Sequence, residues 1–124
     1  MGADPQEIVQ RFNQAINNQD HESLVALMTE DHRFIDSSGA EEQGQARMAA
    51  SWEGFFAAFP DYQNVFEQFA VDGSRVAVRG YSRCSNEPAL EGPAIWVAHV
   101  REGRVSEWRV LKDTPEKRRE FNLD

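Results

Sequence analysis

Apolar residues recur every three or four positions in the first half of the chain, which is the spacing of one helix face. Ile8, Phe12 and Ile16 form such a stripe after Pro5, a residue suited to the first position of a helix. A second, shorter helix is predicted from Asp20. A third runs from about 45 to 59, because the proline that follows disfavours helical geometry in the residue before it.

After residue 60 the pattern changes to segments rich in β-branched and aromatic residues, which indicates strands. We expect strands at 62–71, 75–83, 94–101 and 104–111, with hairpin turns at 72–73 and 102–103. A short strand at 33–35, interrupted by 36–39, precedes the third helix. Helices followed by an antiparallel meander indicate the α+β class. We expect a strongly curved, cone-shaped, antiparallel-rich sheet wrapped around a long helix, with the N-terminal helices closing a pocket, all within one domain, 1–124.

Composition narrows the class of partner. The net charge of −8 argues against nucleic acid, since phosphate binding needs clustered Lys and Arg. No run approaches the ~20 apolar residues of a membrane span, and no signal peptide is visible, so we expect a cytoplasmic protein without membrane contact. The single cysteine excludes an internal disulfide, and three separated histidines lack metal-ligand spacing, so no metal site is predicted.

Three stretches carry a resemblance to a known family: 59–62 (Phe-Pro-Asp-Tyr), 71–79 and 103–114. Their sequences are similar to those of the SnoaL-like polyketide cyclases in the nuclear transport factor 2-like superfamily. The resemblance spans nearly the whole chain. It implies a cystatin-like α+β roll, a hydrophobic pocket, no metal or organic cofactor, and frequent dimers.

The resemblance also implies a chemistry. Cyclases of this family close a polyketide ring by intramolecular aldol condensation, using an acidic residue near the end of the last strand with a histidine nearby. The matching positions here are Asp113 and His99. A carboxylate in an apolar pocket can act as a base, because burial raises its pKa towards the working pH. Two other roles stay open: Asp113 can cap the helix that follows it, and His99 can lie on an outer strand face.

Two functions are therefore expected as alternatives. In the first, the chain is a small-molecule-binding protein that acts as a cofactor-independent cyclase or isomerase by carboxylate acid/base catalysis. In the second, it is a non-catalytic domain that binds a ligand or dimerises. The expected partners are an apolar small molecule and a second copy of the chain.

Further pocket residues are expected among the aromatic and charged positions. A closed cone cannot use every aromatic side chain for packing, so we expect Trp52, Phe56 and Tyr62 to line the cavity. Phe12 and Trp96 match the oxyanion-hole positions of ketosteroid isomerase, but neither supplies the donor required there, so steroid isomerisation is disfavoured and Phe12 is counted as pocket lining.

Two charged positions complete the expected pocket. Asp36 matches the general base of ketosteroid isomerase, and an Asx turn is the alternative role. Arg79, with Asp36 or Asp113, imitates part of the Asp-Arg-Asp arrangement of epoxide hydrolases. His32 is expected on the loop before the first strand.

Strand parity decides whether His99 and Asp113 share a site. A two-residue turn at 102–103 places them on opposite faces, because side chains alternate along a strand. A three-residue bulged loop places them on one face, together with Val105, Glu107, Arg109 and Leu111, and turns Trp96 and Trp108 to the other face. Glu-Gly is not a preferred pair for the tight turn, so we expect the bulged loop. The Trp96–Trp108 pair is then the expected dimer contact.

Overall fold

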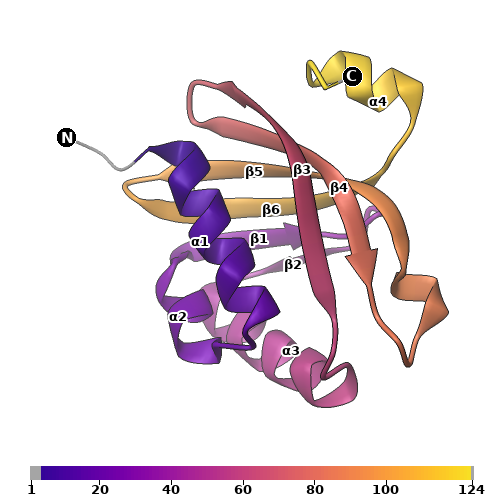
Figure 1. The fold of residues 1–124 in the computed structure, drawn as a ribbon. Helices are drawn as coiled ribbons and strands as arrows, with labels where there is room; N and C mark the ends of the chain where they lie inside the picture. The colour runs from indigo at the N-terminus through magenta and orange to yellow at the C-terminus, as the bar shows by residue number, and fades with distance from the viewer. Residues whose placement is uncertain (1–3, 124) are drawn as a thin grey trace.

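The computed structural model describes residues 4–123 and confirms the α+β class (Figure 1). Its elements are α1 (Pro5–Asn17), α2 (His21–Ala26), β1 (Met28–Ile35), β2 (Glu41–Gln43), α3 (Gln45–Ala58), β3 (Gln63–Asp72), β4 (Arg75–Arg83), the 3₁₀ turn η1 (Pro88–Leu90), β5 (Gly92–Arg101), β6 (Arg104–Lys112) and α4 (Pro115–Glu120). The strands form one curved sheet in the order β2-β1-β6-β5-β4-β3. All neighbours are antiparallel except β1 and β6, which are parallel.

The helices begin and end where local chemistry predicts. Pro5 opens α1, and the Asp20 side chain accepts a hydrogen bond from the Ser23 backbone N–H to cap α2. α3 ends at Ala58, just before the Phe59-Pro60 pair. α1 crosses the inner face of the sheet over β3 to β6, and α3 covers that face at β1 and β2.

The main core lies between these helices and the inner face of the sheet. Its fully buried side chains include Ile8, Val9, Phe12, Ile16, Leu24, Met28, Val76, Val78, Trp96, Val105 and Trp108. The stripe read from the sequence of α1 therefore faces the sheet, as helical spacing predicts.

A second, smaller core lies on the outer face of the sheet. Here α4 turns back over β4 and β5, so that Phe121 and Leu123 pack against Ala77, Ile95 and Val97. α4 therefore covers the face of the sheet opposite to α1 and α3. Thr114, whose hydroxyl accepts from the Lys117 backbone N–H at 3.1 Å, caps this helix.

Two features of the sheet differ from expectation near its beginning. β1 starts at Met28, well before residue 33, and the short strand β2 pairs with its end. His32 therefore lies inside a strand and is fully buried, so its placement on a loop is wrong. Its Nδ1 donates to the backbone oxygen of Val105 on β6, 2.7 Å away. This parallel pairing joins segments far apart in sequence, which local patterns do not reveal.

The β5–β6 hairpin combines the two geometries that the sequence left open. Glu102 and Gly103 both have positive φ, 54° and 76°, and Arg101 pairs with Arg104, so the turn has two residues and the expected three-residue loop is wrong. A bulge at Ser106 then shifts the register, and His99 pairs with Glu107. Beyond the bulge, Glu107 and Arg109 lie on the same face as His99, as predicted. Val105 precedes the bulge and lies on the inner face, opposite to its predicted side.

Candidate functional site

A largely apolar cavity of about 280 Å³ opens between α3 and the inner face of the sheet. Its lining is aromatic and aliphatic, with a few polar groups: Phe34, Asp36, Ser37, Glu42, Met48, Ser51, Trp52, Phe55, Tyr62, Asn64, Leu90, Trp96, Trp108 and Val110. All three tryptophans of the chain line this one cavity. An apolar cavity of about 150 Å³ can hold benzene, so this one suits a ligand of about two rings.

The apolar wall is built by helical and strand periodicity together. Met48, Trp52 and Phe55 lie on one side of α3, and Trp96, Trp108 and Val110 alternate along β5 and β6. Rings pack edge to face within the wall: Trp52 contacts Phe55 at a centroid distance of 5.4 Å and Phe34 at 6.2 Å. Such contacts fix ring orientation and leave a defined space between α3 and the sheet.

Two carboxylates lie at one side of this cavity. Asp36 directly follows β1, and its Oδ1 accepts hydrogen bonds from the Ser38 backbone N–H (2.8 Å), the Ser38 hydroxyl (2.6 Å) and the Ala40 backbone N–H (3.1 Å). The Ser38 hydroxyl is the main cause that lowers the pKa of Asp36. Glu42, on β2, accepts from the Ser51 hydroxyl at 2.7 Å and from Arg47 Nε at 3.3 Å.

Neutral polar groups gather elsewhere in the lining. The Tyr62 hydroxyl lies 3.2 Å from the Ser82 hydroxyl, which donates to Asn64 Oδ1 at 2.8 Å. Asn17 of α1 holds the Asn64 backbone at both its N–H and its oxygen. Burial raises the pKa of Tyr62, so the phenol is neutral and can offer a hydrogen bond. This group anchors the start of β3 beside the cavity.

The cavity contains three of the six pocket residues expected from the sequence: Asp36, Trp52 and Tyr62. Phe12 and Phe56 belong to the packed core and do not line it. Phe12 is fully buried against Trp108, with a ring-centroid distance of 4.6 Å. Their assignment to the pocket is therefore corrected: Phe12 of α1 packs against Trp108, and Phe56 of α3 packs against Trp52 with a ring-centroid distance of 5.5 Å.

Asp113 lies away from the cavity, at the end of β6 on the outer face. Its Oδ1 accepts from Arg118 Nε at 2.7 Å, and its Oδ2 from Arg79 Nε at 3.3 Å. The side chain of Asp113 is 7% exposed. Asp113 thus ties α4 to β4, and Arg79 serves the same link instead of lining the pocket. The cap of α4 is the neighbouring Thr114.

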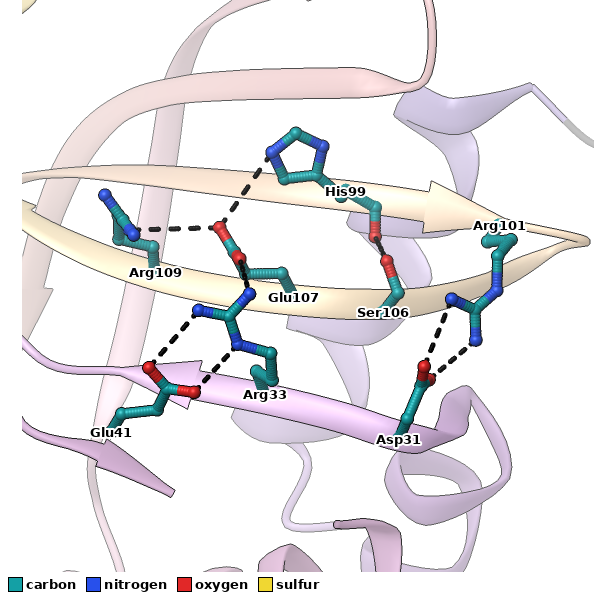
Figure 2. A network of polar contacts seen from close by, with 8 residues as sticks. All are labelled: Asp31, Arg33, Glu41, His99, Arg101, Ser106, Glu107 and Arg109. Atoms are coloured by element: carbon teal, nitrogen blue, oxygen red, sulfur yellow. Dashed lines mark hydrogen bonds and ion pairs between the residues drawn. The ribbon is translucent and has the colours of Figure 1, made fainter. Parts of the chain in front are cut away.

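His99 also lies on the outer face, within a polar network (Figure 2). Its Nε2 is 3.9 Å from Glu107, a carboxylate that also contacts Arg33 at 3.3 Å and Arg109 at 3.8 Å. Arg33 pairs further with Glu41 at 2.8 Å. His99 and Asp113 therefore share a sheet face, but it is the face opposite to the cavity. The prediction that His99 and Asp113 lie in the pocket is therefore wrong. The carboxylates that line the cavity are Asp36 and Glu42.

Trp96 and Trp108 were expected at an exposed dimer contact, and this is wrong. Each is only 1% exposed, and both face the cavity and α1. The homodimer itself stays a prediction. Glu42 was missed because a three-residue strand with polar neighbours has no periodic signal. Phe34, two residues before Asp36 on an alternating strand, could have been found from the sequence.

The chain matches the model of the SnoaL-like domain over residues 9–108 and belongs to this family. No curated protein matches it significantly. A cystatin-fold protein from Novosphingobium aromaticivorans is similar in structure, with 18% identity and a TM-score of 0.78, covering 90% of this chain and 100% of that one.

Two further solved structures carry the same fold. A candidate polyketide cyclase from Streptomyces antibioticus has 22% identity and a TM-score of 0.74 over 90% of this chain and 93% of its own. An epoxide hydrolase of the LEH-like type from M. tuberculosis has 19% identity and a TM-score of 0.77, covering 88% of this chain and 82% of its own. At such identities the likeness shows the fold, the cystatin or nuclear transport factor 2-like roll.

Two further properties of residues 4–123 concern other kinds of site. None of the helices described there is long and apolar enough to cross a bilayer. No group of three or more His, Cys, Asp or Glu side chains within that range is arranged to hold a metal ion.

Proposed function

We propose that this SnoaL-like domain binds a flat, largely apolar small molecule of about two rings in the cavity under α3. One observation carries the proposal: all three tryptophans, with Phe34, Phe55 and Tyr62, surround a space of about 280 Å³ that side chains leave open. Filling such a space with a ligand removes apolar surface from water at roughly 25 cal/mol per Å². Concave apolar sites with a few polar groups are typical of small-molecule sites.

Acid/base catalysis is the second candidate, and Asp36 is the residue that would carry it. It is a carboxylate in the lining of the cavity, whereas Asp113 and His99 lie on the other sheet face. The same hydrogen bonds that keep Asp36 ionised lower its pKa and weaken it as a base. Binding is therefore the function that the geometry supports best.

A bicyclic ketone tests both functions. Titration of the protein with 1-tetralone, followed by tryptophan fluorescence and calorimetry, should give saturable binding, because every tryptophan lines the cavity. Exchange of the α-protons of 1-tetralone for deuterium, followed by NMR, measures enolisation. If Asp36 acts as a base, Asp36→Asn slows this exchange while binding persists.

A matched pair of variants locates the binding site. Val110→Phe adds a ring to the cavity wall and should abolish binding, whereas Val71→Phe makes the same change at a position that is 48% exposed on β3 and should leave binding intact. Circular dichroism checks that both variants fold. Equal affinity of wild type and Val110→Phe for 1-tetralone would contradict the proposal. A lack of saturable binding of 1-tetralone to the wild type would contradict it too.

A further inference from the structure

We propose that the cavity selects ligands whose polar group is a protonated amine and rejects ligands that carry a carboxylate. This inference rests on the proposed function and adds the charge of the ligand to it. It comes from the position of Asp36 and Glu42 relative to the aromatic wall, and from the types of side chain that complete the lining.

Phe34 sets the geometry of the two carboxylates. Glu42 pairs directly with Phe34 across β1 and β2, and Trp108 pairs with Phe34 on the other side, across β1 and β6. Directly opposed side chains have Cβ atoms about 4.5–5.5 Å apart. Asp36 directly follows β1, two residues beyond Phe34, and lines the same cavity. Both carboxylates therefore border the same aromatic side chain and can approach one ligand group.

Each carboxylate keeps one oxygen for a ligand. The three hydrogen bonds to Asp36 all end on Oδ1, and both contacts of Glu42 end on Oε2. Within the described part of the chain, no protein donor contacts Asp36 Oδ2 or Glu42 Oε1. The side chain of Glu42 is 36% exposed, so water reaches this oxygen and a ligand donor would replace it beside the apolar wall.

No cation in the lining offsets these two charges. The described residues that line the cavity include no Lys, Arg or His. Arg47 pairs with Glu42 from outside, and its side chain is 69% exposed, so water screens much of this contact. A ligand carboxylate would lose hydration in an apolar space without gaining a cation. An ammonium group gains both carboxylates and the aromatic faces next to them.

Three matched ligands with one bicyclic frame test the inference: 2-aminotetralin, 2-tetralol and tetralin-2-carboxylic acid. Calorimetric titrations at pH 7 and low salt should give affinities in the order amine, alcohol, acid. We expect the amine to bind about fivefold to tenfold more tightly than the alcohol, the scale of one or two partly exposed ion pairs. Added salt should reduce this preference and leave the alcohol unaffected.

Isosteric neutral variants assign the effect to the two residues. Asp36→Asn keeps an acceptor for Ser38, and Glu42→Gln keeps one for Ser51; each should weaken amine binding several-fold without changing alcohol binding. Glu41→Gln is the control, because it removes the same charge from the same short strand, on the outer face beside Arg33.

The outcomes separate the two proposals. If the alcohol binds and the amine gains nothing, or the acid binds best, the inference on charge is wrong and the apolar site stands. If none of the three ligands binds, the proposed function fails and this inference fails with it. A loss of amine affinity in Glu41→Gln equal to that in Glu42→Gln would also overturn it, since only net charge would then matter.

Discussion

The link between Asp113 and its two arginines gives a prediction that separates structure from catalysis. Asp113→Ala removes two charge-assisted hydrogen bonds from a carboxylate that is 7% exposed. Breaking a buried pair costs about 3–5 kcal/mol, but here the arginine side chains are 35% and 29% exposed and can regain water. We therefore expect the free energy of unfolding to fall by about 2 kcal/mol.

This loss of stability should come from weaker packing of α4 on the sheet, because Asp113 holds Arg118 of that helix. In a chain of this size, about 2 kcal/mol lowers Tm by roughly 6–10 °C. Urea denaturation followed by tryptophan fluorescence measures the change, and calorimetry measures Tm. Asp72→Ala is the control: it removes an aspartate with a side chain that is 74% exposed, also paired to an arginine, and it should change stability by no more than about 0.5 kcal/mol.

Ligand affinity decides whether Asp113 has the structural role of tying α4 to β4 or the catalytic role expected from the sequence. Measured at a temperature where both proteins are folded, binding of 1-tetralone to Asp113→Ala should equal that of wild type, because the cavity lies on the other face of the sheet. A variant with unchanged stability but lost binding would refute this reasoning. It would show that Asp113 reaches the ligand in solution.

Two further predictions concern stability. A Cβ on Gly80 would lie 2.0 Å from the backbone oxygen of Val65, so Gly80→Ala should lower the unfolding free energy by more than about 3 kcal/mol, whereas Gly54→Ala in α3, with open space around it, should stabilise by about 0.5–1 kcal/mol; similar urea midpoints for the two would contradict this. Burial lowers the pKa of His32 from its ordinary value, so the unfolded chain binds a proton that the folded chain excludes as the pH falls below about 6.5. Stability contributed by neutral His32 is thus full above that pH and is lost as the pH falls towards the lowered native pKa. The urea midpoint of wild type should drop more steeply between pH 7 and 5 than that of His32→Gln, and equal slopes would count against the buried neutral imidazole.

Much of the fold could be predicted because its signals are local. The stripe of α1, the proline that ends α3 and the glycines of the hairpins each act within a few residues, and they placed all the long helices and the four strands after Pro60. The short strand β2 and the first half of β1 were missed, because their pairing partners, not their own pattern, make them strands.

The candidate site was predicted only in part, for a physical reason that one hairpin illustrates. The sequence by itself identified part of the aromatic wall: Trp52 and Tyr62 line the cavity as predicted, whereas Trp96 and Trp108 were assigned to the wrong face of the sheet. The tertiary structure decided the faces. A bulge at Ser106 set the parity of β6, and α4 then covered the face that carries Asp113. Periodicity shows which side chains share a face, but only the packing on both sides of the sheet decides which face encloses the cavity.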